Sequence, residues 1–150
     1  MNKYTLKAAN AMYYYGGVYL SVLWSGALSM SLAILLSYYL RMQKMPLWFC
    51  ISPTLLFPLG VGTGACIGYF ITRSTAGDRT KVLVILSFVY LLLFIIVGMV
   101  WMEAFGVFPW KTVFSLMACS VIFCSLSKIL YPIYNAEYKE SDADKPVNHN

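Results

Sequence analysis

Four apolar runs, each long enough to cross a lipid bilayer, constrain this chain more than any other feature of its sequence. They cover residues 12–40, 47–72, 82–102 and 112–134. The hydrocarbon core of a bilayer is about 30 Å thick, and an α-helix crosses it in about 20 apolar residues. Only 11% of the residues are charged, whereas a soluble domain has about 25%. The sequence therefore predicts an all-α membrane protein, a bundle of four transmembrane helices.

Two polar segments flank this predicted transmembrane domain of residues 12–134. Residues 1–11 form a mixed N-terminal segment, and residues 135–150 form a polar tail. We expect the tail to begin as a frayed helix and to end disordered, because it has few apolar residues to bury. Within the second run, Pro53 and Pro58 predict a kink or a break, since proline cannot donate a backbone hydrogen bond.

The basic residues predict the orientation of the four helices. Lys and Arg are more frequent in the cytoplasmic segments of membrane proteins than in the external ones. One side of the predicted membrane holds Lys3, Lys7, Arg73, Arg79, Lys81, Lys128, Lys139 and Lys145, and the other holds Arg41, Lys44 and Lys111. This imbalance predicts that the N- and C-termini are both cytoplasmic.

Small residues recur every four positions in the first two runs. The second run has Gly60, Gly64 and Gly68, and the first run has Gly17, Ser21, Ser25 and Ser29. Residues four apart share one helix face, and small side chains let another helix approach closely. Two interpretations remain open. The two stripes could pack the first helix on the second, in the manner of a glycine zipper, or one stripe could face a partner protein or a second copy of the chain.

Few charged residues lie where they could act within the membrane. Glu103 ends the third run, Lys111 follows it across a short connector, and Lys128 lies near the far end of the fourth run. Each could mark a polar site or an ion path, or could be solvated at the interface, to which a lysine stem can extend. The loop with Arg73, Asp78, Arg79 and Lys81 could set topology or form a docking surface.

The sequence provides little catalytic chemistry. Its only histidine, His149, lies in the tail, and the apolar runs contain no pair of carboxylates and no phosphate-binding glycine loop. We therefore expect no enzyme activity, no cofactor and no metal site. No basic stretch is dense enough for a nucleic-acid site, so we expect the bilayer and another membrane protein as partners.

In size, number of runs and short outer connectors, the whole chain resembles the small inner-membrane immunity and entry-exclusion proteins of bacteria. The resemblance implies a multi-pass protein of the bacterial inner membrane that acts against an incoming toxin, or against a component of plasmid conjugation or of a phage, by binding a protein within the bilayer. Two alternatives stay open. The chain could be an accessory subunit of a secretion, respiratory or polysaccharide-export complex, or a small oligomeric channel or carrier with Glu103 or Lys128 along its path.

Overall fold

A computed structural model describes residues 3–74 and 79–143, and all elements in these two ranges are helical. They are α1 (Lys3–Met42), α2 (Leu47–Ile51), the short 3₁₀ helix η1 (Ser52–Leu55), α3 (Leu56–Ser74), α4 (Arg79–Phe105) and α5 (Trp110–Ala143). Four stretches are long and apolar enough to cross a membrane: Tyr15–Met42, Leu47–Arg73, Thr80–Phe105 and Trp110–Leu130. The chain is a multi-pass membrane protein, and the predicted all-α bundle of four transmembrane helices is confirmed.

The second apolar run is broken where the two prolines predicted an interruption. Residues Leu47–Ile51 form one turn of α2, and the chain then tightens into η1, with Pro53 in its first turn. Pro58 lies in the first turn of α3, where its missing N–H would have no partner in the helix. The prolines therefore separate a short α2 from α3, which carries the glycine stripe.

Two tight connectors join the helices at one end of the bundle. Lys44, between α1 and α2, has φ of 57°, and Gly106, directly after α4, has φ of 73°. The N–H of Gly106 donates to the carbonyl oxygen of Met102 at 2.8 Å, which is the bond that ends a helix on a left-handed residue. Glycine adopts this conformation without the strain that a side chain adds.

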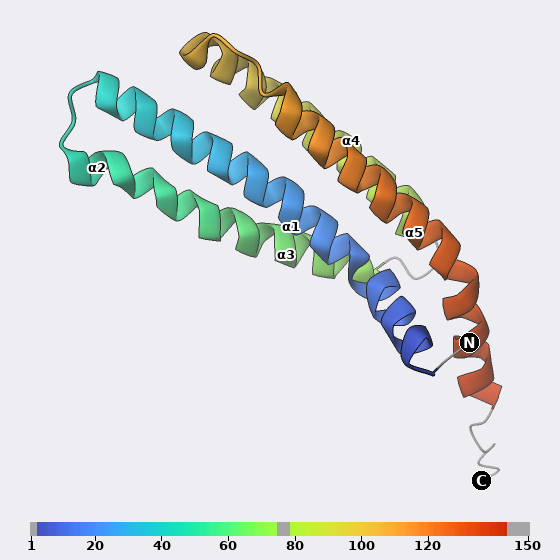
Figure 1. The fold of residues 1–150 in the computed structure, drawn as a ribbon. Coiled ribbons are helices and arrows are strands. Elements are labelled where there is room, and N and C mark those ends of the chain that lie inside the picture. Colours follow the sequence, from blue (N-terminus) through green and yellow to red (C-terminus); the bar gives the residue numbers. More distant parts are fainter. Residues whose placement is uncertain (1–2, 75–78, 144–150) are drawn as a thin grey trace.

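The helices form two antiparallel hairpins, α1 with α2–α3 and α4 with α5 (Figure 1). α1 begins and α5 ends at the same end of the bundle, and the two connectors lie at the other end. α1 is the central helix, since it packs against α3, α4 and α5. α3 packs mainly on α1, touches α4 slightly, and makes no contact with α5 in the described ranges.

The core lies between α1, α4 and α5. Its fully buried side chains include Leu20 and Trp24 of α1 and Phe94 of α4. Tyr90 of α4 and Val113 of α5 belong to the same cluster. The third run thus has one face in the core, while most of its remaining apolar side chains are exposed on the outside of the bundle.

The last helix extends further than the sequence suggested. α5 continues to Ala143, so residues 135–143, the beginning of the predicted tail, are helical. Residues 144–150, with the end of the predicted tail, lie outside the described residues.

Candidate functional site

The two small-residue stripes lie against each other within one chain. Gly60, Gly64 and Gly68 of α3 face α1, where they meet the stripe of Gly17, Ser21, Ser25 and Ser29. All four residues of the α1 stripe are buried. Of the two interpretations that the sequence left open, the structure places these residues in an internal helix–helix contact.

The approach between α1 and α3 leaves no room for larger side chains. A Cβ atom added at Gly64 would lie 2.8 Å from the Ser21 carbonyl oxygen and 2.8 Å from the Ser25 Cβ. One added at Gly68 would lie 2.6 Å from the Cα of Val18, and one at Gly60 would overlap the Ser29 side chain. Since real Cβ atoms do not come this close, any larger residue here would push the helices apart.

Serine hydroxyls join this contact to the backbone. Ser25 donates a hydrogen bond across the interface to the Gly60 carbonyl oxygen at 2.6 Å. Ser29 donates to the carbonyl of Ser25, one turn earlier in its own helix, at 2.5 Å. In a membrane no water is present to satisfy such groups, so each hydroxyl needs a protein partner. The stripe therefore supplies both a close approach and polar contacts.

A second set of polar contacts joins α1 to α4 and α5 across the core. The indole Nε1 of Trp24 donates to the Ser120 hydroxyl of α5 at 2.8 Å, and the Ser120 hydroxyl donates to the Leu116 carbonyl. The Ser21 and Tyr90 hydroxyls lie 3.1 Å apart, and the rings of Trp24 and Tyr90 are stacked. Two hydrogen bonds and a ring stack thus fix α1 against α4 and α5.

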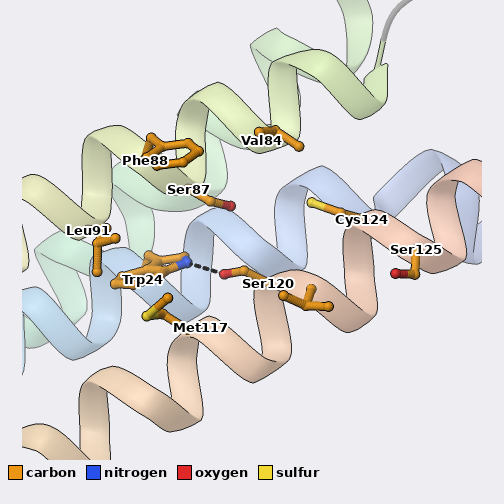
Figure 2. A pocket seen from close by; sticks show the side chains of 10 residues that line it. Trp24, Val84, Ser87, Phe88, Leu91, Met117, Ser120, Cys124 and Ser125 are labelled. Carbon is orange, nitrogen blue, oxygen red and sulfur yellow. Dashed lines mark hydrogen bonds between the residues drawn. The ribbon is translucent and has the colours of Figure 1, made fainter.

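A groove of about 280 Å³ opens between α4 and α5, with Trp24 at its base (Figure 2). The α4 wall includes Ser87, Phe88 and Leu91, and Ser120 lies on the α5 wall (Figure 2). Val121 of α5 also lines the groove. Phe88 and Val121 are more than half exposed, whereas Trp24 is buried. The groove therefore runs from the outer surface of the bundle to the core, and its lining is mainly apolar.

Compared with protein-family models, curated proteins and solved structures, the chain matches none of them. A function can therefore be inferred only from the residues of the chain itself.

The charged residues do not form one site. Glu103, at the end of α4, and Lys111, in the first turn of α5, are both exposed and are not joined by an ion pair, although only a short connector separates them. An exposed pair at such a position would gain little free energy. Lys128 is exposed on α5, 18 residues after Trp110 and thus about 27 Å along the helix. It lies at the end opposite Glu103.

The charged loop between α3 and α4 is described only in part. Arg73 and Lys81 are exposed at its two ends, and Arg79 is the first residue of α4. Asp78 lies outside the described residues. No group of three or more metal-ligating side chains occurs in the described part of the chain, and the expectation of no metal and no cofactor stays a prediction.

Sequence reasoning did not identify the groove or the polar contacts at its base. Ser120, Tyr90 and Phe94 fall in uniformly apolar runs, where no period separates a buried face from a lipid-facing one. One signal was available. A tryptophan in the middle of a transmembrane helix needs an acceptor for its N–H, and this requirement points to a serine on a neighbouring helix.

Proposed function

We propose that the chain is a non-enzymatic inner-membrane protein that binds another membrane protein inside the bilayer, as an immunity or entry-exclusion protein does. The observation that supports this function is the one-sided packing of α3. α3 packs mainly on α1 with its glycine face, and its opposite face is uncovered. A helix that is packed on one side only can receive a second helix on the other.

The uncovered face of α3 has the small side chains that membrane helices use for close contact. Gly62 and Cys66 are four residues apart and exposed, between Leu59 and Phe70, which are also exposed. A Cβ added at Gly62 would meet nothing within 4 Å. Thr63, beside them, is exposed and donates its hydroxyl hydrogen to the Leu59 carbonyl. A partner helix could therefore approach α3 at Gly62 and Cys66 as closely as α1 approaches it at Gly64.

The test is a challenge of cells that express the chain. The cells are exposed to pore-forming toxins and to conjugating donor cells, and survival and plasmid transfer are measured. We expect protection against one of these challenges, and we expect Gly62→Leu to abolish it while the protein accumulates at the normal level, because Gly62 has free space around it. Ala118→Leu, which places the same side chain on the exposed surface of α5, is the matched control and should protect as the original chain does.

Two results would favour the alternatives. A stable stoichiometric complex purified from unchallenged cells would identify an accessory subunit. Ion flux in liposomes that is lost in Glu103→Gln would identify a channel or carrier. Protection that survives Gly62→Leu would contradict the role of the α3 face.

A further inference from the structure

The groove between α4 and α5 is bordered by two rows of side chains, and each row ends on a lysine. On α4 the groove is lined by Leu91, Ser87 and Val84. Lys81 lies one helical turn beyond Val84, three residues earlier in the sequence. On α5, Val121 and Cys124 line it, and Lys128 follows four residues later. Residues three or four apart lie on the same helix face. Both lysines therefore continue the faces that form the groove.

The two lysines lie at the same end of the bundle. The hydroxyls of Thr80 on α4 and Ser127 on α5 are 3.5 Å apart, which places the residues next to them, Lys81 and Lys128, at the same level. A second hollow, lined by Thr80, Lys81, Val84 and Ile85, adjoins the groove at Val84. The concave surface thus continues from Trp24 in the core to Lys81, and both lysines are exposed.

The chemistry of the groove selects an apolar occupant. It lies within three of the four stretches that can cross a membrane, so lipid surrounds its opening. The hydroxyls of Ser87 and Ser120 donate to carbonyls of their own helices, so their hydrogens need no ligand. If the groove were empty, the side chains of its walls would lose dispersion contacts. Water is a poor occupant, because it can form few hydrogen bonds with an apolar surface. A lipid acyl chain fits these conditions.

We propose that this groove binds a membrane phospholipid, with one acyl chain lying over Trp24 and the phosphate beside Lys81 and Lys128. An apolar channel that ends on two cations is complementary to a lipid that has an apolar chain and an anionic headgroup. Anionic lipids bind more tightly than zwitterionic ones, because the lysines attract their net charge. This site is on the other side of α1 from the α3 face, and so it does not depend on the proposed partner protein.

Fluorescence quenching of Trp24 tests the acyl-chain half of the proposal. The full chain is prepared with Trp48, Trp101 and Trp110 replaced by Phe, so that only Trp24 emits. It is then reconstituted in phosphatidylcholine vesicles with brominated acyl chains, which quench an indole at short range. The Trp24 side chain is 1% exposed, but an acyl chain in the groove lies against the side chains that cover it, so we expect quenching.

A matched pair of serine variants shows whether the acyl chain that quenches Trp24 lies in the groove. Ser87→Leu fills the groove and should reduce the quenching of Trp24. Ser115→Leu makes the same change at another serine that donates to the carbonyl four residues earlier, but Ser115 is outside the groove, so quenching should remain. Circular dichroism checks that both variants keep their helix content.

The headgroup half is tested by adding a minor fraction of brominated phosphatidylglycerol to unbrominated phosphatidylcholine. We expect it to quench Trp24 more than the same fraction of brominated phosphatidylcholine does. Lys128→Gln should lower the relative association constant of the anionic lipid by about fivefold, and Lys81→Gln should lower it as well. Lys111→Gln, at the opposite end of α5, should leave it unchanged.

Two results would overturn the proposal. If brominated chains do not quench Trp24, or if Ser87→Leu and Ser115→Leu are quenched equally, no acyl chain lies in the groove. If the two brominated lipids quench equally and Lys128→Gln has no effect, the site does not recognise an anionic headgroup. Neither result depends on the outcome of the challenge experiment.

Discussion

Buried hydroxyls of α1 and α5 take the place that water takes in a soluble protein. Ser21, Ser25 and Ser120 each bond to a group on another helix, and Ser29 bonds within α1. In the bilayer an unpaired polar group has no alternative partner. Small hydroxyl residues therefore specify which helix faces meet, without the cost of burying a charge.

Replacing Ser120 with Ala should destabilise the bundle by about 1 kcal/mol, because interhelical hydrogen bonds in membranes contribute about this much. The change leaves the Trp24 Nε1 buried with no acceptor. Unfolding in mixed micelles with increasing dodecyl sulfate measures the free energy, and the Trp24 emission spectrum reports the change in its surroundings. Ser115→Ala, at an exposed serine bonded only to its own helix, should be neutral. Equal stability of the two variants would show that the Trp24–Ser120 bond contributes nothing.

Gly64→Leu should destabilise the α1–α3 contact by about 1–3 kcal/mol, the usual effect of adding bulk to a packed site. Its Cβ would lie 2.8 Å from the backbone oxygen of Ser21, which cannot move aside as a flexible side chain can. Gly62→Leu, two residues away on the same helix, has free space and should match the original chain in the same unfolding measurement and in cellular accumulation. If Gly60, Gly64 and Gly68 all accept Leu without loss, the close approach of the helices is not what holds α3 on α1.

At the scale of the element, the helices differ in how far their sequences predict their packing. The glycines of α3 predicted a packed face, because Gly60, Gly64 and Gly68 are spaced by four residues and so share one helix face. In α4 almost every position is apolar, so lipid-facing and core-facing residues have the same chemistry. Which of its residues enter the core depends on the contact with α1, and no local pattern records that contact.

Gly98 of α4 shows a packing role that its sequence does not predict, because it is a single glycine among apolar residues. In the structure the Phe108 ring, from the connector after α4, covers Gly98, and a Cβ added there would lie 2.5 Å from the Phe108 Cε2. The glycine lets the connector fold back on α4 and close the α4–α5 hairpin.

Gly98→Leu should therefore loosen this hairpin, by about 1–3 kcal/mol in the free energy of unfolding. Phe108→Ala removes the ring that the new side chain would meet, so adding it to Gly98→Leu should recover part of the loss. The four proteins of this double-mutant cycle give a coupling free energy, expected to be about 0.5–3 kcal/mol. Additive effects of the two changes would mean that Gly98 and Phe108 do not act on each other.

For the whole molecule, the order of contacts around α1 explains how one short chain can present two different surfaces. α1 is covered by α3 on one side and by α4 and α5 on the other. The outer face of α3 is therefore uncovered within the chain, while the groove lies between α4 and α5. The number of spans could be predicted from run length alone, but this arrangement could not, because nothing in the sequence states which helices are neighbours.

The direction in which the bundle crosses the membrane is the prediction that belongs to the molecule as a whole. The excess of Lys and Arg on one side predicts that the α3–α4 loop is cytoplasmic and that the two tight connectors are external. The four native cysteines are free and can be replaced by Ala, which leaves a background for single new cysteines at exposed positions. Gln43→Cys and Lys111→Cys should react with a membrane-impermeant maleimide in intact spheroplasts, whereas Lys81→Cys should react only after the membrane is permeabilised. The reverse pattern would invert the topology, and it would place the lysines of the proposed phospholipid site in the outer leaflet rather than the inner one.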